Sequence, residues 1–153
     1  MPEITKPFLN LLFVEDDRDD REFITQALEK LNIPYEASFA MDCFEIYKLF
    51  GENKVFDIIF MDINLPLMNG KDCLKQIKAD ERYKDIPVIM FTGSSAQMDI
   101  DFGFNNGAHY HVVKPIAHIN FVASLKIVLG INWKEKQPRP PFEKYVVNLT
   151  FSS

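Results

Sequence analysis

The chain has 153 residues, of which 47% are hydrophobic and 25% charged, and its formal net charge is −5. This length and composition indicate one soluble globular domain with a proper core, and the acidic balance argues against non-specific binding of nucleic acid, which requires a basic surface. No apolar run approaches membrane-spanning length, and residues 1–10 lack the basic-then-apolar order of a signal peptide. We therefore expect a cytoplasmic protein that contacts neither membrane nor nucleic acid directly.

Apolar runs and turn signals predict five strands that alternate with five helices. The first strand covers residues 8–14 and ends in the acidic run Glu15-Asp16-Asp17, of which Asp17 can cap the helix that follows. This alternation is typical of an α/β fold in which helices cover both faces of a doubly wound parallel sheet. The predictions continue with a helix to residue 31, a strand over 35–39, a helix over 43–50, a strand over 55–61, a helix over 70–79, a strand over 87–91, a weaker helix over 96–106, a strand over 109–113 and a helix over 121–129.

Residues 131–153 depart from this alternation. The proline cluster at 138–141 predicts a stiff extended spacer, and the apolar segment 145–151 predicts either a short strand or an adhesive tail. We therefore expect one domain over residues 1–130 and a C-terminal extension over residues 131–153 that is too short to form a second domain.

The chain has two cysteines, and both lie within apolar helical patterns. Cys43 and Cys73 lack the spacing of metal ligands. We expect both to be small core residues in their reduced form, as in a protein of a reducing compartment.

Polar side chains follow four of the predicted strands, at the point where each strand ends. A strand-end aspartate alone is often only a helix cap, and a Lys-Pro pair is usually a loop. Because the carboxyl ends of parallel strands meet at one edge of a sheet, however, the joint occurrence of these residues indicates a site. They are Glu15 and Asp16 after the first strand, Asp62 after the third, Thr92 after the fourth and Lys114 after the fifth.

The residue types at these strand ends suit phosphoryl chemistry. Three carboxylates that lie close together repel one another unless a cation is bound, and an all-oxygen site suits Mg²⁺ or Mn²⁺. Lys114 would place a positive charge against a phosphate oxygen, and the Thr92 hydroxyl would donate a hydrogen bond. Asp62 would act as the nucleophile and form an acyl phosphate.

Four segments carry a resemblance to a known family: LFVEDD at 12–17, MDINLPLMNG at 61–70, FTGS at 91–94 and VVKP at 112–115. With these motifs the chain resembles the receiver domain of two-component response regulators over roughly residues 8–130. The resemblance implies a flavodoxin-like sheet with the strand order 2-1-3-4-5. The acidic run over residues 15–20, together with Trp133, looks most similar to single-domain receivers of the phytochrome-associated type.

The same resemblance implies the chemistry of the site. Asp62 would accept a phosphoryl group from a sensor histidine kinase or phosphotransfer protein, and Lys114 would pair with that group, with a cis bond between Lys114 and Pro115. The family's metal ligands correspond to the carboxylates of Asp16 and Asp62 and the backbone carbonyl of Asn64.

Three further positions follow from the resemblance. Glu15 would contribute to the metal site through water. Thr92 would take part in switching, and His111 stands where the family has its switch aromatic residue. We expect a phosphoacceptor that signals by protein contact or relay, whose own chemistry is limited to self-phosphorylation and slow self-dephosphorylation.

Three other functions remain open at this point. A metal-dependent phosphatase with an aspartyl nucleophile usually has a second acid two residues on, where this chain has Asn64. A flavin- or nucleotide-binding module would need a phosphate-binding loop after the first strand, where Glu15-Asp16-Asp17 would repel phosphate. A pseudo-receiver, which never accepts phosphate, would not need the complete set of site residues that the chain retains.

Two aromatic residues on the fourth predicted helix indicate a contact surface. Phe102 and Phe104 lie about 200° apart around a helix, so they cannot both face the core. We expect a homodimer through the fourth helix, fifth strand and fifth helix, strengthened by phosphorylation, with the segment 145–151 added to a neighbouring molecule's sheet.

Overall fold

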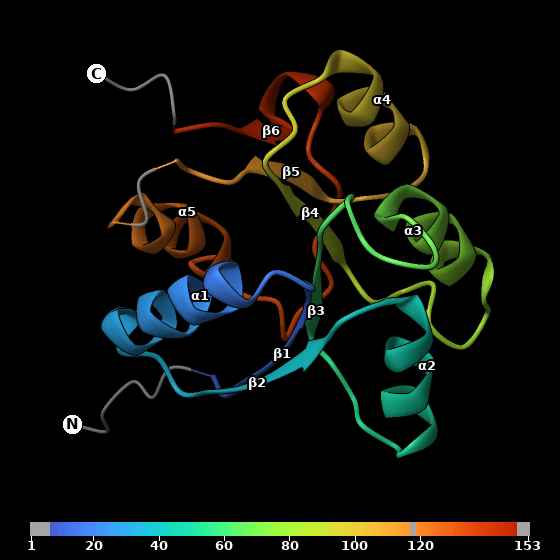
Figure 1. Ribbon diagram of the computed structural model, residues 1–153, viewed down its shortest axis with the longest axis horizontal. Helices are drawn as coiled ribbons and strands as arrows, with labels where there is room; N and C mark the ends of the chain where they lie inside the picture. Colours follow the sequence, from blue (N-terminus) through green and yellow to red (C-terminus); the bar gives the residue numbers. More distant parts are fainter. Residues whose placement is uncertain (1–6, 117–118, 150–153) are drawn as a thin grey trace.

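A computed structural model of the chain describes residues 7–116 and 119–149 (Figure 1). Its parallel sheet has the strand order β2-β1-β3-β4-β5-β6, which confirms the predicted 2-1-3-4-5 order and adds one strand. The strands are β1 (Leu9–Val14), β2 (Tyr35–Ala40), β3 (Ile58–Met61), β4 (Val88–Thr92), β5 (Tyr110–Val113) and β6 (Val146–Val147). The helices are α1 (Arg18–Leu31), α2 (Cys43–Gly51), α3 (Gly70–Ala79), α4 (Gln97–Asn105), α5 (Ile119–Leu129) and the 3₁₀ helix η1 (Phe142–Lys144).

Short-range signals place the starts of α1, α2 and α3 as predicted, whereas α4 begins one residue later and α5 two residues earlier than predicted. Asp17, Asp42 and Asn69 each accept a hydrogen bond at the first turn of α1, α2 and α3. The strand β3 begins three residues later than predicted, because Val55 is 77% exposed and lies outside the sheet.

The sheet separates two hydrophobic cores. Helices α1 and α5 cover one face, and α2, α3 and α4 cover the other (Figure 1). The strands β3 and β4 are buried at every position, as expected for a parallel sheet with helices on both faces. Among the described residues, no helix has the length and apolar character required to cross a membrane.

The expectation that both cysteines are reduced is wrong. Cys43 and Cys73 are buried, as predicted, but they form a disulfide with a Cα–Cα distance of 5.9 Å. The two residues lie in the first turns of α2 and α3, which face the same core cluster, so the fold brings the two sulfurs together. A sequence separation of 30 residues offered no sign of this pairing.

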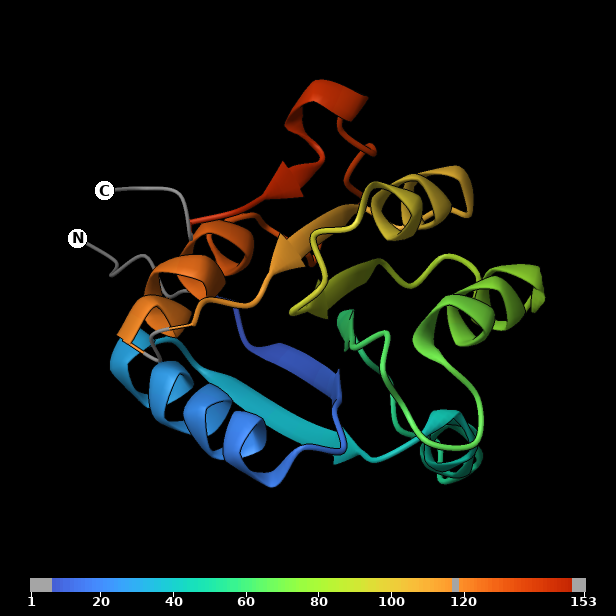
Figure 2. The ribbon, with the colours of Figure 1, turned by 45° about the horizontal axis from the view of Figure 1, so that its top comes forward.

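The C-terminal extension folds back onto the sheet of its own chain. Figure 2 shows it in red, with β6 beside β5, and Val146 and Val147 pair in parallel with His111 and Val112. The expectation that this segment joins a neighbouring molecule's sheet is therefore wrong for residues 146–147, while residues 150–151 of it lie outside the described part. The extension packs on the domain, and this packing does not test where the domain ends. The division into residues 1–130 and 131–153 therefore stays a prediction.

Three side chains hold the extension in place. Trp133 is buried and donates from Nε1 to the Val128 carbonyl over 2.8 Å. Arg139 donates from Nε to the Ala108 carbonyl over 3.0 Å, and its guanidinium lies over the ring of Phe104. Tyr145 is fully buried in the core cluster that α2, α3 and α4 cover.

These contacts change the predicted contact surface on α4. The ring of Phe104 packs edge-on against Phe142 and Tyr145, so the chain's own extension covers it. Phe102 is half-buried, with the ammonium of Lys71 5.5 Å from its ring centroid. A homodimer through α4, β5 and α5 stays a prediction, but β6 already occupies the edge of β5.

Candidate functional site

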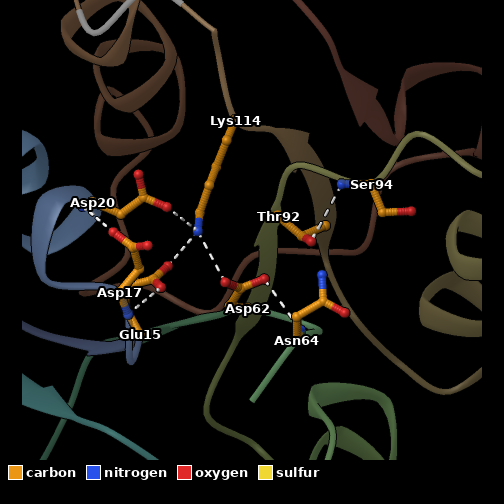
Figure 3. Close-up of polar contacts among 8 residues, drawn as sticks. All are labelled: Glu15, Asp17, Asp20, Asp62, Asn64, Thr92, Ser94 and Lys114. Atoms are coloured by element: carbon orange, nitrogen blue, oxygen red, sulfur yellow. Dashed lines mark hydrogen bonds and ion pairs between the residues drawn. The ribbon is translucent and has the colours of Figure 1, made fainter.

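The residues predicted at the strand ends lie together at the carboxyl edge of the sheet (Figure 3). Glu15 follows β1, Asp62 follows β3, and Thr92 is the last residue of β4. Lys114 follows β5 and crosses to the carboxylates beside β1 and β3. Glu15 and Asp62 are buried, as is the uncharged Thr92, so the parallel sheet places two carboxyl groups where little water reaches them.

The ammonium of Lys114 is the centre of the site. Its Nζ lies 2.9 Å from Asp62 Oδ2 and 2.8 Å from Asp20 Oδ2, and it also donates to Glu15 Oε2. All three donor positions of a lysine are thereby used. Since the side chain is only 8% exposed, this ion-pair network lies in a low-dielectric environment where each charge needs its partners.

Sequence patterns assigned no partner role to Asp20, although its acidic run was visible. Asp20 lies in the first turn of α1, and its backbone N–H donates to the capping carboxylate of Asp17 over 2.9 Å. This cap sets the direction of α1 so that the Asp20 carboxylate faces Lys114. The run of acidic residues directly after β1 is the sequence signal that could have indicated this role of Asp20.

The environment shifts the proton equilibria of the site. Burial raises the pKa of Glu15 to about 7, helped by the charge of Asp62, although Lys114 acts in the opposite direction. For Lys114, burial lowers the pKa, but the carboxylates of Asp62 and Glu15 outweigh that effect and keep its pKa above the usual range. Lys114 therefore remains a cation.

Three carboxylates offer a set of ligands for a divalent cation. One oxygen each from Glu15, Asp16 and Asp62 lie within 4.8 Å of one another. All are hard oxygen donors, which fits Mg²⁺ or Mn²⁺. Asn64 lies two residues after Asp62, and its backbone N–H donates to Asp62 Oδ1 over 3.3 Å.

The loop after β3 folds tightly back onto Asp62. The N–H of Gly70 donates to the Ile63 carbonyl over 2.7 Å. A Cβ atom at Gly70 would lie 1.9 Å from the Asp62 carbonyl oxygen, so no other residue fits there without moving the backbone. The start of α3 thus fixes the backbone of Asp62.

A second network leads from Thr92 towards α4. Ser94 donates from its backbone N to Thr92 Oγ1 over 3.4 Å, and its carbonyl lies 2.8 Å from His111 Nε2. Burial lowers the pKa of His111, against the opposing effects of the Ser94 carbonyl and Asp99, so the imidazole is neutral at pH 7. Ser94 Oγ donates to Asp99 Oδ2 over 2.5 Å, which ties the same loop to α4.

The expectation of a cis Lys114–Pro115 bond is wrong. None of the described residues has a cis peptide bond, so this bond is trans, the isomer that X–Pro bonds prefer by about 0.5–1 kcal/mol. Lys114 reaches Asp62 and Glu15 from the trans bond.

Comparison with known proteins gives consistent matches. The family described as "response regulator receiver domain" matches residues 11–126. The chemotaxis protein CheY1 of Helicobacter pylori is 31% identical over 126 residues, which cover 81% of this chain and 99% of CheY1.

Solved structures with the same fold include those of two response regulators. The phosphorylated cyanobacterial phytochrome response regulator RcpA covers 88% of this chain and 100% of its own, with a TM-score of 0.76 at 23% identity. The Mn²⁺-bound form of response regulator Rcp1 covers 87% of this chain and 99% of its own, with a TM-score of 0.71 at 25% identity.

Proposed function

Because this chain belongs to the receiver-domain family of two-component response regulators, we propose that it accepts a phosphoryl group on Asp62. The donor is a sensor histidine kinase or a phosphotransfer protein, and the output is protein contact or onward relay. The observation that carries this proposal is the buried ammonium of Lys114, held 2.9 Å from Asp62 Oδ2 beside the carboxylates of Glu15 and Asp20.

The geometry suggests how each residue acts. An Asp62 carboxylate oxygen attacks phosphorus, the bond from phosphorus to the donor breaks, and the leaving group keeps that electron pair. Lys114 exchanges a carboxylate partner for a phosphoryl oxygen, so its charge remains compensated. The Thr92 hydroxyl donates to another phosphoryl oxygen.

A divalent cation fits this proposal. When bound, Mg²⁺ would neutralise charge that develops on the phosphoryl oxygens. Asp16 and Asp62 would hold it with their carboxylates and Asn64 with its backbone carbonyl, while Glu15 would act through water. The Mn²⁺-bound form of the related Rcp1 supports the binding of a divalent cation.

We expect Mg²⁺ binding to weaken at least about tenfold in Asp16→Ala without loss of folding. Removing a charged ligand lowers metal affinity, and it also relieves repulsion among the carboxylates of the metal-free protein. Isothermal titration calorimetry measures the affinity, with Asp19→Ala, an exposed acid in the first turn of α1, as the matched control. Equal Mg²⁺ affinity in Asp16→Ala and the wild type would place the metal elsewhere.

Incubation with acetyl phosphate and Mg²⁺ should add one phosphoryl group, seen by intact-mass analysis. Asp62→Asn should gain none, because an amide oxygen is a far weaker nucleophile than a carboxylate. Asp101→Asn, which removes a carboxylate from α4, should react like the wild type. Phosphorylation of the Asp62 variant to the same extent would contradict the role of Asp62, and no reaction of the wild type would favour the pseudo-receiver. The phosphatase alternative predicts steady turnover of phosphate esters.

Switching would use the network that starts at Thr92. A phosphoryl group at Asp62 would draw the Thr92 hydroxyl towards it, which changes the contacts of Ser94 with Thr92 and His111. Because the His111 imidazole is buried and neutral, it can move within the protein without carrying a charge out of water. The surface of α4 and β5 would then report the state of Asp62 to a partner.

A further inference from the structure

A cavity of about 510 Å³ lies at the end of the sheet opposite to Asp62. Pro87 and His109, which line it, come directly before β4 and β5, whereas Asp62 follows β3. Residues 133–139 of the C-terminal extension form its other wall. Its volume lies within the range of about 300–1,000 Å³ that small-molecule sites occupy.

The lining of this cavity is strongly cationic, although the chain as a whole carries a net charge of −5. Two of its side chains are carboxylates, Asp85 and Glu135. Its cationic side chains are more numerous, and they come from α3, the loop before β4 and the extension. They are Lys78, Lys84, Lys134, Lys136 and Arg139.

Three of these cations form no ion pair with a carboxylate in the described part of the chain. Lys84 pairs with Glu81 over 2.9 Å, and Lys134 pairs with Asp57 over 2.8 Å. For Lys78, Lys136 and Arg139, no carboxylate oxygen of residues 7–116 and 119–149 lies within the 4.0 Å of an ion pair. With five cations against two carboxylates, the lining has a net charge of +3, and a cluster with this excess of positive charge attracts anions.

Lys78 and Arg139 are positioned by the backbone. Lys78 Nζ donates to the carbonyls of Lys84 and Ile86 over 2.9 and 2.7 Å, so one of its three donors has no partner among residues 7–116 and 119–149. Arg139 donates to the carbonyls of Phe104 and Ala108 and retains further N–H groups. Neither side chain needs to be ordered when an anion arrives, which favours binding.

The electrostatics of Lys78 favour an anion beside its ammonium. Burial is the main cause that lowers the pKa of Lys78 to about 8; the charge of Asp85 opposes this shift, and the charge of Arg139 adds to it. A bound anion would offset the effects of burial and of Arg139. This shift supports the geometry but would not by itself indicate a ligand.

We propose that this cavity binds a small phosphate polyanion, of the size and charge of pyrophosphate or the diphosphate group of a nucleotide. A lysine ammonium and an arginine guanidinium are the groups that recognise phosphate oxygens, and three unpaired cations match a ligand with several charges. The site is separate from Asp62 and does not depend on the phosphoacceptor function. Because residues 133–139 form one wall, the ligand also holds the extension against the sheet.

The single tryptophan of the chain provides the measurement, since Trp133 lines the cavity and its ring lies 5.6 Å from that of His109. Titration of the full chain with pyrophosphate in metal-free buffer should give a saturable change in tryptophan fluorescence at submillimolar concentrations. The apparent affinity should fall as salt is added. Hydrogen exchange over residues 133–147 should slow when pyrophosphate is bound.

Single substitutions distinguish binding in this cavity from general attraction of anions to surface lysines. Lys136→Gln removes an exposed cation and should weaken pyrophosphate binding about tenfold, as should Lys78→Gln. Lys75→Gln, an exposed lysine of α3 outside the cavity, and Asp62→Asn should bind as the wild type does. No saturable signal up to millimolar pyrophosphate, equal weakening by Lys75→Gln and Lys136→Gln, or equal binding of citrate would overturn the proposal.

Discussion

Gly70→Ala should lower the free energy of unfolding by about 3 kcal/mol or more. A Cβ atom at this position would lie 1.9 Å from the Asp62 carbonyl oxygen and 2.9 Å from Ile63 Cα, and both are backbone atoms that no side-chain rotation can move away. Relief requires α3 to move away from β3, which also displaces the carboxylate that Lys114 holds. Urea denaturation followed by circular dichroism measures the loss, and the rate of acetyl phosphate labelling measures the displacement.

Gly51→Ala is the matched control for this substitution. Gly51 is the last residue of α2, and an added Cβ would meet no atom within 4 Å. Alanine is favoured over glycine in helices by up to about 1 kcal/mol, so Gly51→Ala should leave stability unchanged or raise it slightly. If Gly70→Ala were as stable as Gly51→Ala, the loop after β3 would not approach Asp62 closely in solution.

Tyr145→Ala should lower the free energy of unfolding by about 3–5 kcal/mol, as truncation of a fully buried aromatic residue usually does. The ring packs against Phe104 and Phe142, and its hydroxyl reaches the space over Gly103 on α4. Its removal leaves a void between the extension and the domain. Urea denaturation measures the stability, and faster hydrogen exchange over residues 142–147 would locate the effect.

Two control variants define the role of Tyr145. The Tyr145 hydroxyl is buried without a hydrogen-bond partner among the described residues, so Tyr145→Phe should be neutral or stabilising. Lys144→Ala, at the neighbouring exposed position, should change stability by less than about 0.5 kcal/mol. A loss below about 1 kcal/mol in Tyr145→Ala would mean that the extension does not dock on β5 in solution.

The docked extension also bears on how the domain contacts partners. An uncovered β5 would present an unpaired sheet edge, which readily recruits strands from other chains. Here β6 of the same chain covers part of that edge, and Phe104 lies beneath the extension. A partner that recognises α4 and β5 must therefore contact the extension as well.

The local pattern of the sequence determined where the elements lie and which residues meet at the sheet edge. Apolar runs mark buried strands and helix caps mark helix starts, and both depend on neighbours a few residues apart. For this reason α3 was predicted over residues 70–79, which are its observed bounds. Since parallel strands share one direction, Glu15, Asp62, Thr92 and Lys114 had to converge once the strands were placed.

Only the tertiary structure decided which distant groups pair. The pattern showed that Cys43 and Cys73 face a core, but not that they face each other. It showed a β-prone tail, but not that β5 of the same chain would accept it, or that Lys78 and Arg139 would line one cavity. Burial is encoded by the periodicity of a segment, whereas the identity of a partner depends on how whole elements pack, and packing is set by contacts between residues far apart in the chain.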